Sequence, residues 1–138
     1  MAMERRLAIL RWIMVFLTLS TLVHYTHNFV EVDQYPKSFV PNWVTRVGVF
    51  VTWPAFTAFG VAGYRLYRRG RFPLAHACLI TYSTVGWLTL GHFTSGNPDI
   101  PAFFYATLFT DAIGAAMVTA WVVWSARLPE TTRRPVAP

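Results

Sequence analysis

Residues 19–36 read L-S-T-L-V-H-Y-T-H-N-F-V-E-V-D-Q-Y-P, and this stretch closes a long apolar run with a set of polar side chains. His24 lies three residues before His27 and four before Asn28, and His27 lies four residues before Glu31. On a helix, residues three or four apart share a face. The spacing therefore predicts a helix whose end carries a polar site.

A similar motif occurs in the second half of the chain. Residues 21–26, T-L-V-H-Y-T, and residues 89–94, T-L-G-H-F-T, share four identical positions and one aromatic exchange, and each is followed by an acid and a proline. A true internal repeat would make the chain two related helical hairpins, with His24 and His92 at matched depth. A six-residue match can also arise by chance, so both interpretations stay open.

The composition is that of a membrane protein. Hydrophobic residues make up 54% of the chain and charged residues 13%, whereas soluble domains carry about 25% charged residues. The formal net charge is +6, but the basic residues lie in short segments between apolar runs. We therefore expect a lipid bilayer, and no nucleic acid, as the partner. The single cysteine, Cys78, excludes an internal disulfide and a multi-cysteine metal motif.

Four apolar runs are long enough to cross about 30 Å of hydrocarbon as helices. They are residues 7–29, 43–64, 74–93 and 102–124. The predicted fold is all-α, an integral membrane four-helix bundle that forms one domain over residues 1–128. Gly60, Gly63 and Gly114 are interpreted as close-packing positions. The polar, proline-rich tail at 129–138 is predicted to be disordered.

The basic residues predict the orientation. Ten of the twelve Lys and Arg residues lie at the N-terminus, between the second and third runs, or after the fourth. The opposite loops carry Glu31, Asp33 and Asp99, with Lys37 as their basic residue. By the positive-inside rule both termini are cytoplasmic, and the chain is predicted to be integral to the cytoplasmic (plasma) membrane.

Asp111 lies about nine residues into the fourth run, which places it about 13 Å below the start of that helix. Ionisable side chains at such depth are costly and usually face the bundle interior with a partner. Asp111 either pairs with Arg46 or a histidine to fix helix packing, or it anchors a ligand, an ion or a proton. Because His24 and His92 are expected in the same half of the bundle, Asp111, His24 and His92 are the candidate catalytic residues.

Imidazoles and a carboxylate on successive turns are also candidate metal ligands. His24, His27 and Glu31, with His92 or Asp111 completing the set, offer donors suited to zinc, iron, copper or manganese. A haem held by His24 and His92 is a narrower alternative. The chain has no C-x-x-C-H motif for covalent haem attachment, which argues against it.

Several short motifs resemble those of a known family. A Tyr35-Pro36 loop follows the first run, and the second run contains Pro54. The basic turn Y-R-R-G-R at 67–71 precedes a third run that contains I-T-Y-S at 80–83. In these motifs, from about residue 25 to 124, the chain resembles the EXPERA class of small membrane proteins, which includes the sterol isomerase/emopamil-binding group and the sigma-2 receptor.

The resemblance implies a pocket for a lipophilic, sterol- or terpenoid-like ligand that opens within the bilayer. Where that family has acidic residues in its cavity, this sequence has His24, His27 and Asp111. In such a pocket, the acid–base groups of these three residues would face a lining of aromatic side chains. The predicted ligand pocket comprises Tyr25, Asn28, Arg46, Trp53, Trp87 and Phe104.

Three functional hypotheses follow from the sequence. The first is a membrane-embedded binding protein or small enzyme with an outward-facing His/Asp pocket that binds a metal ion. The second is an EXPERA-like binder or isomerase of a lipophilic ligand, which would act by acid–base chemistry. The third is a structural accessory subunit of a membrane complex. A homodimer is left open, and the ligand and reaction are not specified by these patterns.

Overall fold

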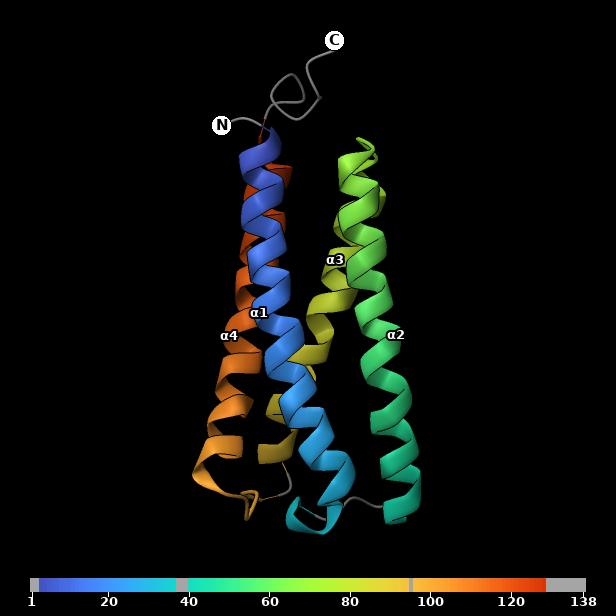
Figure 1. Ribbon diagram of the computed structural model, residues 1–138, viewed down its shortest axis with the longest axis vertical. Coiled ribbons are helices and arrows are strands. Elements are labelled where there is room, and N and C mark those ends of the chain that lie inside the picture. Colours follow the sequence, from blue (N-terminus) through green and yellow to red (C-terminus); the bar gives the residue numbers. More distant parts are fainter. Residues whose placement is uncertain (1–2, 37–39, 95, 129–138) are drawn as a thin grey trace.

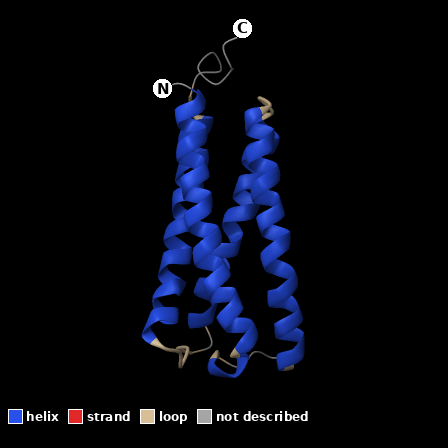
Figure 2. Ribbon diagram, viewed as in Figure 1, coloured by secondary structure: helices blue, strands red, loops and turns tan. Residues whose placement is uncertain are grey.

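Helices make up the described part of the chain, residues 3–36, 40–94 and 96–128 of a computed structural model (Figures 1 and 2). The elements are α1 (Met3–Val30), η1 (Val32–Gln34), α2 (Asn42–Arg68), α3 (Phe72–Trp87), η2 (Leu88–Phe93) and α4 (Ala102–Ala126), where η1 and η2 are 3-10 helices. These residues contain no strand, so the predicted all-α class is confirmed. The tail at 129–138, predicted to be disordered, lies outside the described residues.

The four α-helices pack in a ring. Contacts join α1 to α2, α2 to α3, α3 to α4 and α4 back to α1, whereas the diagonal pair α1 and α3 meets in few places. The start of α1, the end of α4 and the turn between α2 and α3 lie at one end of the bundle (Figure 1). The loops after α1 and before α4 lie at the other end.

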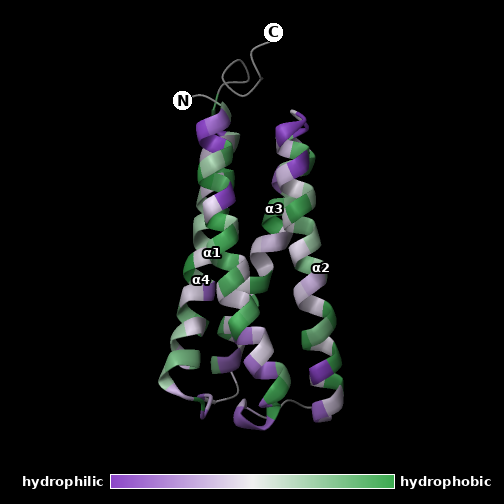
Figure 3. Cartoon of the chain, viewed as in Figure 1, coloured by the Kyte–Doolittle hydropathy of each residue, from purple (hydrophilic) through white to green (hydrophobic). Residues whose placement is uncertain are grey.

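The two ends differ in charge. We call the first the basic end, because Arg5, Arg6, the α2–α3 turn at 68–71 and Arg127 lie there. The second is the acidic end, which carries Glu31, Asp33 and Asp99. Figure 3 shows hydrophilic colour at both ends and largely apolar helix between them. The chain therefore has the charge pattern from which its orientation was predicted.

Three helices, α1, α2 and α4, are long and apolar enough to cross a membrane. Large apolar side chains point outward from them, including Trp12, Phe50 and Phe103, each about two-thirds exposed. Helix α2 is the least buried of the three. A bundle that places its apolar side chains on the outside is consistent with a membrane protein.

The third predicted run, 74–93, forms two different helices. The α-helical part ends at Trp87, and η2 continues to Phe93. The Thr89 hydroxyl donates to the Gly86 carbonyl at 2.7 Å and to the Leu108 carbonyl at 3.2 Å. The second bond ties η2 to α4. Of the two halves of the proposed repeat, residues 21–26 are α-helical, whereas 89–93 of the 89–94 motif are 3-10 helix, so the two halves adopt different backbones.

Glycines allow the helices to approach closely. A Cβ atom at Gly60 would lie 2.9 Å from the Tyr82 ring, and one at Gly114 would lie 3.0 Å from Leu17 Cβ. Leu17 itself is fully buried and belongs to the central apolar core. These contacts confirm the close packing predicted for Gly60 and Gly114. The Gly114 contact also brings α1 close to α4 next to the polar side chains described below.

Candidate functional site: a buried histidine–aspartate cluster

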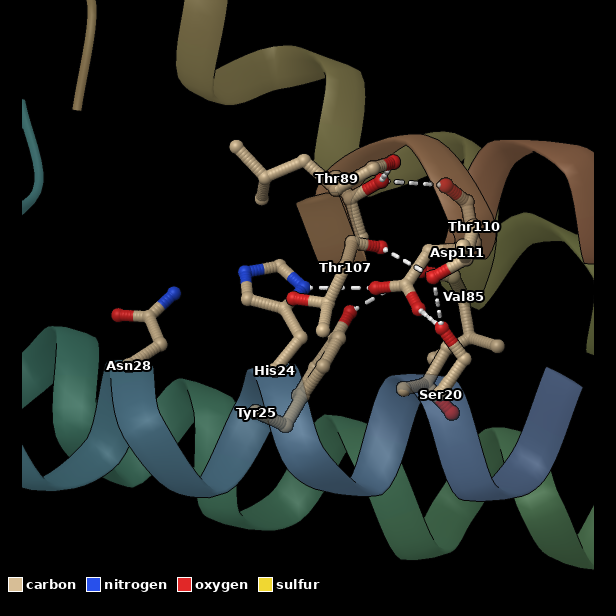
Figure 4. Close-up of polar contacts among 12 residues, drawn as sticks. Ser20, His24, Tyr25, Asn28, Val85, Thr89, Thr107, Thr110 and Asp111 are labelled. Carbon is tan, nitrogen blue, oxygen red and sulfur yellow. Dashed lines mark hydrogen bonds and ion pairs between the residues drawn. The ribbon is translucent and has the colours of Figure 1, made fainter. Parts of the chain in front are cut away.

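Asp111 of α4 and His24 of α1 form a short contact, which is an ion pair when the imidazole is protonated. The His24 Nδ1 atom lies 2.7 Å from Asp111 Oδ2. The other carboxylate oxygen, Oδ1, accepts a 2.5 Å hydrogen bond from the Ser20 hydroxyl. Ser20 lies one helical turn before His24, so both partners of the carboxylate come from the same face of α1. Figure 4 shows Asp111 reaching across from α4 to these two side chains.

The pair is buried inside the bundle. The side chains of His24 and Asp111 are 1% and 0% exposed. A carboxylate in such a place requires hydrogen-bond donors, because a buried and unpaired charge is very unfavourable. Ser20 and His24 each give one donor, and the Thr110 hydroxyl lies 2.7 Å from that of Ser20. The carboxylate is therefore held by two groups from α1, and its orientation is fixed.

The second nitrogen of His24, Nε2, is buried and has no hydrogen-bond partner among the described residues. A carboxylate accepts the Nδ1 hydrogen, so in the neutral imidazole Nε2 carries the lone pair. His92 of η2 lies beside it, with the two rings edge to face and their centroids 5.2 Å apart. This arrangement leaves a buried base next to a second imidazole.

Asn28 completes this side of the cluster. Its amide nitrogen lies 3.3 Å from His92 Nε2, and its carbonyl oxygen, Oδ1, is buried without a partner in the described structure. The His24 ring lies between Asn28 and Asp111 (Figure 4). Buried polar atoms in proteins are nearly always hydrogen-bonded. His24 Nε2 and Asn28 Oδ1 are therefore two buried polar atoms of this cluster without a partner in the described residues.

Tyr35 covers the cluster at the acidic end. Its hydroxyl lies 3.0 Å from His27 Nδ1, and its ring centroid lies 4.8 Å from that of His92. Tyr35 follows η1, and only 5% of it is exposed. Burial, followed by the charge of Asp111, raises the pKa of Tyr35 above its ordinary value, so the hydroxyl stays protonated. Tyr35 thus presents a neutral hydroxyl and an aromatic face to the histidines.

His27 lies at the border between the cluster and the surface. Its ring stacks on Phe104 of α4 with a centroid distance of 3.8 Å. The two side chains help to line an open cavity of about 600 Å³ at the acidic end, to which Glu31 and Gln34 also contribute. His27 therefore connects the outer surface to Tyr35, and Tyr35 in turn contacts His92 and His24.

Not all the predicted site residues lie in the cluster. Glu31 is exposed and accepts a hydrogen bond from Gln34 at 3.2 Å. The Arg46 guanidinium reaches the Val30 carbonyl at 3.4 Å. Trp87 lies on the α3–α4 surface, with Nε1 3.5 Å from the Thr119 hydroxyl. The structure gathers His24, His27, His92 and Asp111, with Asn28, Tyr25 and Phe104 around them.

Tyr25 and Trp53 lie beside the cluster, on the side of α2. The Tyr25 ring meets His24 edge to face at 5.4 Å, and its hydroxyl donates to the Val85 carbonyl at 3.3 Å. Trp53 donates from Nε1 to the Thr21 hydroxyl at 3.1 Å. Both aromatic side chains therefore separate the polar cluster from the surface between α1 and α2.

Three contributors to the cluster were not predicted: Ser20, Thr110 and Tyr35. Ser20 could have been found, because it lies four residues before His24 and so on the same face of the predicted helix. Thr110 directly precedes Asp111, and no sequence pattern marks it as a member of the site. Tyr35 depends on how the loop after α1 folds back, which helical periodicity does not describe.

The cluster is identified neither by a set of three metal ligands among the described residues nor by a related protein. In the described ranges, the structure holds no group of three or more His, Cys, Asp and Glu side chains arranged to hold a metal ion. No protein-family profile matches the chain, and no curated protein or solved structure is significantly similar to it. The resemblance to the EXPERA class therefore stays a prediction from short motifs.

Proposed function

We propose that this protein is a membrane-embedded binding protein or small enzyme in which His24, His92 and Asp111 form a site for a divalent transition metal ion. The proposal rests on the hydrogen-bond partners of the two ring nitrogens of His24. Asp111 holds Nδ1, and this leaves Nε2 buried without a partner. Histidines that bind metals almost always donate their other ring N–H to a carboxylate or carbonyl, which orients the ring and makes it a better ligand.

Two imidazoles and an amide oxygen are the donors available to such an ion. His24 Nε2 and Asn28 Oδ1 have no other partner in the described chain. His92 Nε2 has one long contact, 3.3 Å from the Asn28 amide nitrogen, which a metal ion would replace. Imidazole donors suit zinc, copper and iron, and oxygen donors also suit manganese. Asp111 acts in this proposal as the group that orients His24, not as a ligand.

We further propose that the bundle crosses the cytoplasmic membrane four times with its basic end inside. The α3–η2 segment would supply the fourth crossing. The distribution of arginines supports this orientation. The metal site would then lie in the outer half of the bundle, reached from the cavity at His27.

The orientation can be tested with single cysteines in a Cys78→Ala background. Asp99→Cys at the acidic end should react with a membrane-impermeant maleimide on intact cells. Arg69→Cys at the basic end should react only after the cells are permeabilised. The reverse pattern would place the basic end outside, and labelling of both in intact cells would contradict an even number of crossings.

The metal site is tested by elemental analysis of the protein purified in mild detergent, together with titration of the metal-stripped protein with zinc, iron(II), copper and manganese. We expect one ion per chain. His24→Ala and His92→Ala should each abolish tight binding. Asp111→Asn should weaken it by about 10–100-fold, the usual effect of removing a carboxylate that orients a histidine ligand.

The matched control is His76→Ala, the same chemical change at the basic end, where His76 Nε2 lies 3.2 Å from the Ser125 hydroxyl. This variant should keep the full metal content. A wild-type protein that binds none of the four metals would refute the proposal. Equal loss of metal in His76→Ala would indicate general damage to the fold.

A further inference from the structure

Helices α1 and α2 border an apolar groove that is distinct from the polar cluster. Two cavities lie along it, of about 320 and 410 Å³. The residues from α1 recur every three or four positions along both cavities, so they form one continuous strip. That strip comprises Arg11, Met14, Val15, Thr18, Leu19, Leu22, Tyr25, Thr26 and Phe29.

The groove is almost as long as a bilayer is thick. Eighteen positions separate Arg11 from Phe29, which at 1.5 Å per residue is about 27 Å. The hydrocarbon core of a bilayer is about 30 Å across. One chain of an ordinary phospholipid occupies only its own leaflet, about half of this thickness. An occupant that fills the whole groove therefore needs a longer chain.

The lining of the groove is apolar along most of its length. Two of its threonine hydroxyls have partners within the protein: Thr18 lies 2.7 Å from the Tyr82 hydroxyl, and Thr57 donates to the Trp53 carbonyl at 2.8 Å. Aromatic rings of Tyr25, Phe50 and Trp53 form the part nearest the acidic end. Such a surface favours a hydrocarbon chain and offers little to a polar molecule.

Arg11 places one positive charge at the basic end of this groove. It is exposed, and it lies over the Trp12 ring at 5.8 Å. The structure gives it no ion pair with an acidic side chain of the described residues. Tyr64 of α2 lines the same cavity. An arginine near the end of a membrane helix extends its guanidinium to the membrane surface, where it can also bind an anionic headgroup.

We propose that the α1–α2 groove binds a single-chain anionic lipid of the polyprenyl phosphate type. The phosphate is held by Arg11 at the basic end, where guanidinium–phosphate hydrogen bonds are strong. The chain runs along the groove past the midplane to Tyr25 and Phe29. This site does not depend on a metal ion, although Tyr25 brings the end of the chain close to His24.

The test is binding of heptaprenyl phosphate to the full-length protein in mild detergent, measured by native mass spectrometry and by photocrosslinking with a diazirine analogue. We expect one lipid per chain, crosslinked to α1 and α2 residues of the groove. Arg11→Gln should weaken binding about tenfold or more, as expected for loss of a charge-assisted contact. The neutral alcohol heptaprenol should bind the wild type more weakly by a similar factor.

Two matched controls separate this site from general lipid contact. Arg69→Gln removes one charge from the same end outside the groove and should bind normally. Val61→Phe fills the groove and should block binding, whereas Ala55→Phe, at an exposed position of the same helix that lines neither cavity, should not. Binding of dioleoylphosphatidylglycerol as tight as that of heptaprenyl phosphate, or equal weakening in Arg11→Gln and Arg69→Gln, would overturn the proposal.

Discussion

The two ends of the bundle bury polar groups of different kinds. At the basic end, the Tyr67 and Ser125 hydroxyls lie 2.8 Å apart, and His76 Nε2 lies 3.2 Å from the same Ser125 oxygen. Apart from the imidazole, these groups are neutral hydroxyls that join α2, α3 and α4. At the acidic end, a fully buried carboxylate pairs with His24, and one nitrogen of that histidine has no partner in the described chain.

The basic end also buries the Arg6 side chain, which is 2% exposed, so the contrast between the ends lies in the Asp111–His24 pair of the acidic end. Neutral hydroxyl pairs join helices at little desolvation cost. A buried ion pair contributes little net stability, because its desolvation offsets most of the attraction, and an apolar pair of similar shape would often be as stable. The buried Asp111–His24 pair is therefore consistent with the proposed ion site, in which a carboxylate orients His24.

The largest effect is expected from Asp111→Ala. The substitution leaves His24 Nδ1 and the Ser20 hydroxyl without their acceptor in the core. Breaking one partner of a buried pair typically costs about 3–5 kcal/mol. The measurement is unfolding in mixed detergent and SDS micelles, followed by tryptophan fluorescence. A loss no larger than that of Ser125→Ala would remove the contrast between the two ends.

A somewhat smaller loss is expected from Gly86→Ala. The new Cβ would meet the Asp111 carbonyl oxygen directly and would lie 2.9 Å from Ala115 Cβ. Backbone atoms cannot easily move away, so we expect a cost of about 1–3 kcal/mol. Gly91→Ala, whose Cβ would have no neighbour within 4 Å, is the control and should be close to neutral. Equal effects of the two substitutions would mean that the end of α3 at Gly86 is not pressed against α4.

Ser125→Ala should cost about 1 kcal/mol, the usual value for one buried hydrogen bond. It removes the oxygen shared by Tyr67 and His76 at the basic end. Metal content should not change, because the site proposed for the ion lies at the acidic end. The same unfolding assay and elemental analysis measure both outcomes, and altered metal binding would show that the ends are coupled.

The smallest effect is expected from Tyr35→Phe, at about 0.5–1.5 kcal/mol for the lost contact with His27. Its pH dependence is more informative than its size. The folded-state pKa of Tyr35 is raised above the ordinary 10.0, so its contribution to stability is complete below pH 10 and falls as the pH rises further. Above pH 10 the wild type should lose stability faster than Tyr35→Phe. Parallel pH profiles would mean that Tyr35 is not buried over the histidines.

Much of the fold could be predicted from the sequence because it depends on local patterns. The apolar runs at 7–29, 43–64 and 102–124 match α1, α2 and α4 to within four residues at each end, since run length and helical spacing set these limits directly. The change from α3 to η2 could not be predicted in this way. It coincides with contacts between residues far apart in the sequence, namely the Thr89 bond to the Leu108 carbonyl and the close approach of Gly86 to α4.

In the site, too, residues placed by helical spacing could be predicted, whereas residues placed by long-range folding could not. Spacing on one helix placed His24 and Asn28 together, and membrane topology placed Asp111 and His92 near them. Glu31 was included by spacing, but α1 ends at Val30, so its side chain lies on the exposed surface. Tyr35 was not included, since its position over the histidines comes from the fold of the loop and not from any repeat.

The 3-10 geometry of η2 also affects how far this part of the chain reaches. Six residues of 3-10 helix rise about 12 Å, compared with about 9 Å in an α-helix. The sixteen residues of α3 rise only about 24 Å by themselves. A count of long α-helices alone gives an odd number of crossings and so places the termini on opposite sides of a bilayer. In the proposed four-crossing topology, the segment from Leu88 to Phe93 extends α3 and makes the number even.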